Sequence, residues 1–167
     1  MPVNIKPLSP ELYESLASLL TELHCYYTDP PTASREDIRS HLLENLLPQN
    51  GLCLPVAVDE NNQVVGFAAL VLMHSLVDPG AQGRRQCLLK ELYVSSNCRS
   101  KGVGRQLVQW AAVFAIRAGC GRMDWNVKAS NKRGINFYKA LGGQLVEDRL
   151  SFRLSAESLS WLAQGVA

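Results

Sequence analysis

The first quarter of the chain shows hydrophobic spacing typical of a short strand followed by two helices. Residues 3–8 alternate as a strand, and Ser9 with Pro10 makes a good helix start. Apolar residues then recur at helical spacing as far as about residue 26: Leu12, Leu16, Leu19, Leu20 and Leu23. A second amphipathic helix is predicted from Ser34, with this apolar face: Ile38, Leu42, Leu43 and Leu46.

The middle of the chain is typical of consecutive strands. Residues 52–58 and 64–73 predict two strands joined by a turn at 59–62. The segment 78–83 combines proline, glycine and polar residues, which indicates a flexible loop. This loop leads into a third apolar run of strand type at 88–94.

The second half returns to helical spacing. A long helix is predicted after Gly104, with this buried stripe: Leu107, Trp110, Ala111, Phe114 and Ala118. Gly119 and Gly121 end that helix. Residues 123–127 alternate as a strand, and a further helix begins at Asn131.

Length and composition fit one globular domain over residues 1–167, in which 155–167 form a C-terminal extension with a terminal helix. The chain is 47% hydrophobic and 19% charged, and its net charge of +2 is too small to indicate nucleic-acid binding. No apolar run approaches the 18 residues that a membrane span needs, and the N-terminus has no signal-peptide pattern. We therefore expect no membrane partner.

The five cysteines are odd in number and follow no metal-ligand spacing. This pattern is typical of reduced thiols in a cytoplasmic protein, so no metal site is expected.

The segment between the 88–94 strand and the long helix has the composition of a phosphate-binding loop. The first amides of a helix have no intrahelical partner, and the helix dipole places partial positive charge there. Gly102 and Gly104 let an anion approach the backbone, and Arg99, Lys101 and Arg105 surround the loop with positive charge.

Two other phosphate loops are excluded by the local sequence. A dinucleotide loop needs glycine where this chain has Leu107, and a Walker loop needs Gly-Lys-Ser/Thr where the order here is Lys101-Gly102-Val103. Between residues 84 and 105 there are six cations and one carboxylate, a local excess that suits a polyanionic ligand such as coenzyme A.

Two motifs resemble the GCN5-related N-acetyltransferases. The Leu-Tyr-Val strand end and Arg99-x-x-Gly102-x-Gly104 resemble that family's acyl-CoA signature, and residues 131–143 resemble its Asn-x-x-Ala/Gly-x-x-Phe-Tyr helix. The match covers residues 88–143. Within it, the sequence Asn-Phe-Tyr-Lys is most similar to that of the diamine (spermidine/spermine) branch. The resemblance implies an α/β fold with a central mixed sheet, helices on both faces, and the order β-α-α-β-β-β-α-β-α-β.

The resemblance also implies transfer of an acetyl group from acetyl-CoA to a primary amine, by direct attack in a ternary complex. It assigns cofactor binding to ten residues: Leu92, Val94, Arg99, Ser100, Lys101, Gly102, Val103, Gly104, Arg105 and Asn131. Leu92 and Val94 would pair with the pantetheine arm. Tyr138 would protonate the departing sulfur, and it lies seven residues after Asn131, on the same helix face.

The general base is left open by the sequence. In the diamine branch a glutamate stands where this chain has Lys90, and the neighbouring Glu91 has the right chemistry. Because a strand alternates faces, Glu91 serves only if a bulge re-aims it. The alternatives are water or His24, since histidine is the side chain that acts most often as a general base.

The acceptor is equally open. An acidic rim for a polyamine would consist of Asp29, Glu36 and Asp37, although helix capping explains the last two as well. A small-molecule amine or a peptide amine would fit. Because Lys90 stands where the diamine branch has a glutamate, the chain could also be a non-catalytic coenzyme-binding module. A nucleic-acid-binding domain is the weakest alternative. Since this fold often self-associates, we expect a homodimer.

Overall fold

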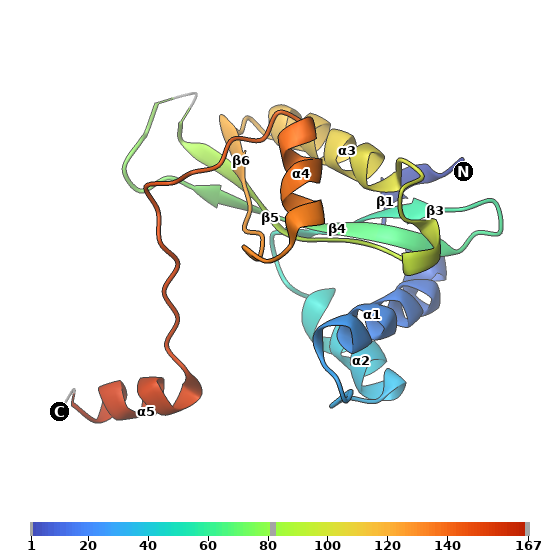
Figure 1. Ribbon diagram of the computed structural model, residues 1–167, viewed down its shortest axis with the longest axis horizontal. Helices are drawn as coiled ribbons and strands as arrows, with labels where there is room; N and C mark the ends of the chain where they lie inside the picture. The colour runs from blue at the N-terminus through green and yellow to red at the C-terminus, as the bar shows by residue number, and fades with distance from the viewer. Residues whose placement is uncertain (1, 81–82, 166–167) are drawn as a thin grey trace. The chain divides into compact units, whose positions relative to one another are not determined.

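The computed structural model describes residues 2–80 and 83–165 (Figure 1). Parts of two predictions, residues 81–82 of the loop and 166–167 of the extension, lie outside this range. The chain divides into two compact units, Met1–Asn126 and Val127–Ala167. Each unit is described separately.

The first unit contains a six-stranded mixed sheet, which confirms the predicted fold class. The order is β1-β3-β4-β5-β6, with β2 paired to β4. All pairs are antiparallel except β5 with β6. The bounds are β1 Asn4–Pro7, β2 Leu52–Cys53, β3 Pro55–Val58, β4 Val64–His74, β5 Arg85–Val94 and β6 Arg122–Asp124.

Helices cover both faces of this sheet (Figure 1). On one face lie α1 (Tyr13–Tyr27), entered through a 3-10 turn at Pro10–Leu12, and α2 (Arg35–His41), followed by a π turn at Leu42–Leu46. The predicted helical leucines pack here, and the fully buried ones are Leu12, Leu16 and Leu42. Burial of such side chains stabilises a fold by about 2 kcal/mol each.

The opposite face is covered by α3 (Val103–Arg117). Its buried line runs through Val103, Leu107, Ala111 and Ala115, one residue in every four. Only Leu107 and Ala111 of the predicted stripe are therefore fully buried. Trp110 and Phe114 are half-buried and stack on each other, with ring centroids 5.6 Å apart.

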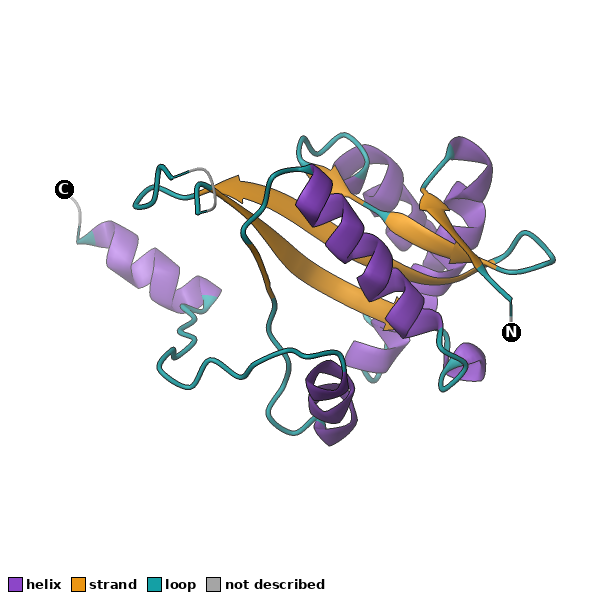
Figure 2. Ribbon diagram, turned by 90° about the horizontal axis from the view of Figure 1, so that it is seen from above, coloured by secondary structure: helices purple, strands orange, loops and turns teal. Residues whose placement is uncertain are grey.

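Three sequence predictions need correction. The strand predicted at 52–58 is two strands, β2 and β3, broken at Leu54. The strand predicted at 123–127 ends at Asp124, where its pairing with β5 stops. The final strand of the expected order is absent, because residues 141–155 form only turns and irregular backbone (Figure 2).

The second unit holds two helices. α4 (Lys132–Ala140) is capped at its start by the Asn131 side chain, and α5 (Ala156–Gln164) by Ser155. The predicted terminal helix is thus confirmed. Among the helices of residues 2–80 and 83–165, none has the length and apolar character needed to span a membrane.

Candidate active site

The two central strands separate part-way along their length. β5 pairs with β6 only over Gln86–Leu88, opposite Arg122–Asp124. From Leu89 to Val94, β5 keeps β4 on one side, and no strand of the described residues pairs with its other side (Figure 2). A strand edge of this kind can pair with an extended ligand, as it would with another strand. The edge includes Leu92 and Val94, the two residues assigned to the pantetheine arm.

The loop of residues 95–102 connects this open edge to the start of α3. A 3-10 turn at Ser96–Cys98 follows β5, and Ser100 and Gly102 then adopt positive φ angles of 62° and 82°. Gly102 is the N-cap of α3 and supplies no side-chain hydrogen bond. The amides of the first turn therefore point out of the helix without a side-chain cap, which is the arrangement that binds phosphate.

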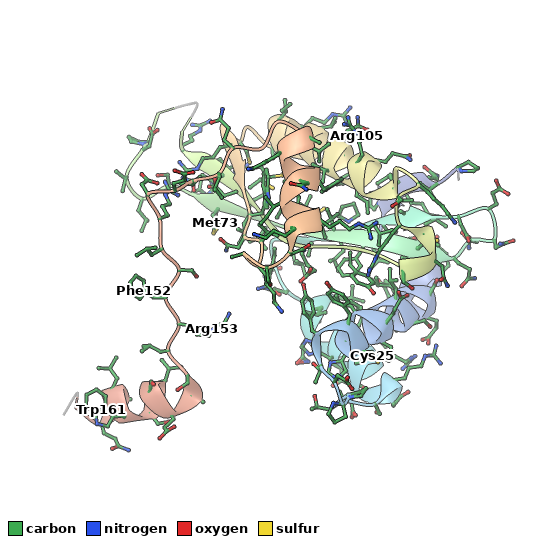
Figure 3. All side chains as sticks on the ribbon, in the orientation of Figure 1. Cys25, Met73, Arg105, Phe152, Arg153 and Trp161 are labelled. Carbon is green, nitrogen blue, oxygen red and sulfur yellow. The ribbon has the colours of Figure 1, made fainter. Side chains whose placement is uncertain are left out.

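The three cations of the loop occupy different environments. The Arg99 guanidinium lies over two adjacent rings, 5.4 Å from the centre of Tyr26 and 5.3 Å from that of Tyr93, and its Nε donates to the Val94 carbonyl at 3.0 Å. Lys101 Nζ donates to the Asn97 carbonyl at 2.9 Å. Arg105 is exposed on the first turn of α3 (Figure 3). Arg99 thus anchors the loop to α1 as well as contributing charge.

Glu22 of α1 holds the same loop from the face of the sheet that α1 covers. Its carboxylate accepts hydrogen bonds from the Ser96 amide at 2.8 Å and from the Tyr93 hydroxyl at 3.1 Å. Partial burial raises the pKa of Glu22, but these hydrogen bonds outweigh it, so that the pKa lies below its ordinary value of 4.5. Burial and the Glu22 carboxylate together raise the pKa of Tyr93 to about 12.

Replacing Glu22 with alanine is expected to lower the free energy of unfolding by about 1–2 kcal/mol, because two donors lose their acceptor. The acetyl-CoA affinity should fall with it. Because the native pKa of Glu22 is depressed, wild type should be more stable than the variant above pH 4.5. This difference in unfolding free energy should disappear as the pH falls through the native pKa. Chemical denaturation at several pH values measures this.

The control is Glu14→Ala on the same helix. Glu14 forms exposed ion pairs with Arg39 at 2.6 Å and with Arg35 at 4.0 Å, so its loss should cost less than about 0.5 kcal/mol. Equal losses for the two variants would contradict the anchoring role of Glu22.

A β-bulge lies next to Glu91. Ala69 pairs with Glu91 but the next residue, Leu70, pairs with Leu89, so Lys90 is the extra residue of β5. Glu91 shares a face with Tyr93, the face that α1 covers, as it would in a regular strand, while the bulge places Leu89 on the other face. The bulge therefore changes the residues before Glu91 and not Glu91 itself, and the role of Glu91 as the base stays a prediction.

Glu91 faces Tyr27 of α1, whose hydroxyl donates to the Glu91 carboxylate at 3.3 Å. Burial raises the pKa of Glu91 above 4.5, and the hydrogen bonds from Tyr27 and the Leu92 amide only partly offset it. A carboxylate with a raised pKa is a better proton acceptor than a fully solvated one.

The other candidates on α1 and α2 have structural contacts. His24 Nε2 accepts hydrogen bonds from the amides of Thr32 and Ala33, at 3.1 and 3.2 Å, and so holds the connection between the two helices. Asp37 forms a capping box with Ser34, which confirms the capping explanation for that carboxylate. The imidazole lone pair and the Asp37 carboxylate are therefore both already engaged.

In the second unit, Asn131 and Tyr138 lie at the two ends of α4. The Asn131 Oδ1 atom accepts the Gly134 amide at 2.9 Å. The half-buried Tyr138 ring packs edge-on against Phe137, with centroids 5.1 Å apart, and the Tyr138 carbonyl accepts the Gly143 amide at 2.9 Å. Both ends of α4 are thus held in place by hydrogen bonds.

Comparison with known proteins identifies the family. The sequence profile of the acetyltransferase (GNAT) family matches residues 16–142, which is most of the chain. The chain belongs to the GNAT family. The open edge of β5 and the Arg99 to Gly104 loop lie inside the matched range.

Among curated GNAT relatives, a mouse (Mus musculus) thialysine N-epsilon-acetyltransferase is 35% identical over 107 residues, which are 62% of this chain and 60% of that protein. An L-ornithine N5-acetyltransferase from Arabidopsis thaliana is 28% identical over 81 residues, 48% of this chain and 36% of that protein. The chain thus spans less than two thirds of the curated relatives it matches.

Solved structures extend the likeness over more than nine tenths of the chain. An integron cassette protein from the mobile metagenome of V. cholerae is 30% identical, with a TM-score of 0.88 over 98% of this chain and 99% of that one. An aminoglycoside N-acetyltransferase solved in complex with CoA shares the fold, with a TM-score of 0.74, 20% identity, and coverage of 93% and 95%.

In the first unit, the structure brings the predicted β5 and loop residues together in one continuous segment. Asn131 and Tyr138 belong to the second unit, and their catalytic and binding roles stay predictions. Sequence reasoning missed Glu22, which contacts residues 71 and 74 positions away, and the pairing of Tyr27 with Glu91. No local sequence signal marks such distant partners.

Proposed function

We propose that this GNAT protein is an acetyl-CoA-dependent N-acetyltransferase acting on a primary amine by direct attack in a ternary complex. The observation that carries the proposal is the six-residue open edge of β5, which the 95–102 loop connects to the first-turn amides of α3, where no side chain caps the helix. The edge suits the extended pantetheine, and the helix start suits the diphosphate.

Two side chains would handle the protons. Glu91, held by Tyr27, would accept a proton from the incoming ammonium group, and the neutral amine would attack the thioester carbonyl. A strand amide would stabilise the resulting oxyanion. Tyr138 would donate its phenolic proton to the departing thiolate.

The acceptor class can be narrowed. The names of both curated relatives place the acetyl group on a side-chain nitrogen of a small amino acid. The α1–α2 connection offers few uncommitted carboxylates, because Asp37 caps a helix and Glu36 lies 3.7 Å from Arg39. We infer a small molecule with one terminal primary amine, rather than a polyamine.

The test is a thiol-release assay with acetyl-CoA and a panel of amino acids with side-chain amines, polyamines, aminoglycosides and peptides. We expect turnover with the terminal-amine amino acids at least about tenfold above the polyamines, in kcat/KM. Tight coenzyme binding without turnover on any amine would favour the non-catalytic module instead.

Replacing Glu91 with glutamine is expected to lower kcat about 10²-fold and to remove the acidic limb of the pH–rate profile. Because the native pKa is raised, the folded state favours the protonated carboxyl group over the ionised one. The stability that the protonated group contributes is therefore lost as the pH rises through the native pKa. The variant should therefore be at least as stable as wild type at pH 7. Glu60→Gln, in an exposed turn, is the control. A destabilised but active Glu91 variant would indicate a structural carboxylate.

We also infer a cytoplasmic location and a homodimeric state. All five cysteines are unpaired, which is typical of a reducing compartment. Burial raises the pKa of the Cys87 thiol to about 11, which keeps it unreactive.

A further inference from the structure

The end of α1 is held against β5 and the loop that follows it. The Glu22 carboxylate accepts a hydrogen bond from the Ser96 amide at 2.8 Å, and the Tyr26 ring centre lies 5.4 Å from the Arg99 guanidinium. Tyr27 is the last residue of this helix. Because both contacts lie within its last two turns, the backbone that carries Tyr27 is fixed relative to β5.

The Tyr27 hydroxyl reaches a carboxylate that is 64 positions away in the sequence. It donates to the Oε1 atom of Glu91 at 3.3 Å. Hydrogen bonds of a catalytic group are often long in the free enzyme and tighten when substrates are bound. A carboxylate has two oxygen atoms that can accept hydrogen bonds. A phenol that holds one of them fixes the plane of the carboxylate and leaves the second oxygen to accept a proton.

The surroundings of Glu91 oppose its use as a base. Burial raises the pKa of Glu91 by favouring the protonated form, which cannot accept a proton. Within the first unit, three groups act in the other direction: the Tyr27 hydroxyl of α1 first, then the Leu92 amide and the Lys90 charge on β5. β4 places the uncharged Ala69 opposite Glu91. Removal of the Tyr27 hydroxyl should therefore raise the pKa of Glu91 further.

Tyr27 keeps its own proton over the pH range in which Glu91 titrates. Burial raises the pKa of Tyr27 above its ordinary value of 10.0, and the Glu91 carboxylate raises it further through its charge and its hydrogen bond. The phenol is therefore a hydrogen-bond donor to Glu91 at every pH at which the carboxyl group changes its protonation state.

We propose that Tyr27 is a positioning residue for the general base: its hydroxyl holds one oxygen of Glu91, so that the other oxygen receives the proton of the acceptor amine. In this step one proton moves from the ammonium nitrogen to the free carboxylate oxygen, a neutral amine remains, and Tyr27 keeps its proton. The proposal rests on the acetyltransferase function proposed above. It gives α1 a part in the chemistry, because the helix that holds the 95–102 loop also holds the base.

The test compares the pH dependence of kcat for wild type, Tyr27→Phe and Tyr13→Phe, with acetyl-CoA and the best amine of the panel. Tyr27→Phe keeps the ring and removes only the hydroxyl, and Tyr13→Phe removes a hydroxyl from the other end of the same helix.

The two variants should behave differently. A higher pKa of Glu91 leaves less of it ionised at a given low pH, so the acidic limb should move to higher pH in Tyr27→Phe. Below the midpoint of that limb, kcat should be at least about fivefold lower than in wild type, and on the plateau within about threefold of it. The control should match wild type throughout. An equal loss at every pH would mean that the hydroxyl only packs, and would overturn the proposal.

A double-variant cycle shows whether Tyr27 acts through Glu91. In the Glu91→Gln background no carboxylate is left to hold, so Tyr27→Phe should change kcat by less than about twofold. Losses that multiply would show that Tyr27 acts independently of Glu91, which would also overturn the proposal.

NMR titration of the Glu91 carboxyl carbon, in the presence of CoA, measures the contact without turnover. Glu91 should titrate at higher pH in Tyr27→Phe than in wild type. An unchanged titration in an active enzyme would overturn the positioning role alone. No turnover of any amine by wild type would instead overturn the acetyltransferase function, and with it the part in the reaction proposed for Tyr27.

Discussion

Replacing Tyr138 with phenylalanine is expected to lower kcat about 10²-fold while leaving the acetyl-CoA dissociation constant within about threefold of wild type. The change removes only the phenolic oxygen and keeps the edge-on ring contact with Phe137. If the phenol protonates the thiolate, its loss affects the chemical step and not coenzyme binding. Stopped-flow or steady-state thiol release, with calorimetry for binding, measures both quantities.

The matched control for this variant is Tyr13→Phe, at the start of α1. It deletes the same hydroxyl from the first unit and should leave kcat unchanged. Full activity of Tyr138→Phe would show that the phenol is packing only, and the leaving thiolate would then take its proton from water.

Replacing Gly102 with alanine is expected to weaken acetyl-CoA binding at least tenfold, or about 1.4 kcal/mol. Gly102 has φ +82°, and a Cβ built there meets no protein atom within 4 Å. The added methyl group would instead occupy the space through which a diphosphate approaches the α3 amides. Calorimetric titration of the purified variant measures the loss.

Gly119→Ala is an unusually close control. Gly119 lies at the other end of α3, has φ +74°, and also has open space around a built Cβ. Both variants should lose about 1–2 kcal/mol of stability, because alanine is strained in this backbone region. Only Gly102→Ala should lose affinity. Equal affinities would mean that the diphosphate binds elsewhere.

Local patterns predicted the parts of this molecule that depend on neighbouring residues. The leucine spacing of α1 and the strand, loop and glycine order around Gly102 are set by helix and strand periods, so they could be predicted. The break at Leu54 and the end of β6 at Asp124 depend on pairing with other strands, and the sequence placed them wrongly.

In the site, too, the features that depend on residues distant in the sequence could not be predicted. The bulge at Lys90 depends on the register between β4 and β5, which no local spacing encodes. Glu22 reaches Ser96 across 74 positions of sequence, so its role needed the fold. The final strand was expected from the element order of the family, but a strand forms only where it pairs with another strand, and residues 141–155 form none.

The central claim is that the open edge of β5 and the start of α3 hold the coenzyme. Hydrogen exchange with and without CoA tests it directly. We predict that bound CoA slows exchange at the backbone amides from Leu92 to Arg105 and leaves those of β1 and β3 unchanged. Binding that leaves the 92–105 amides unprotected, or no binding at millimolar CoA, would contradict the account.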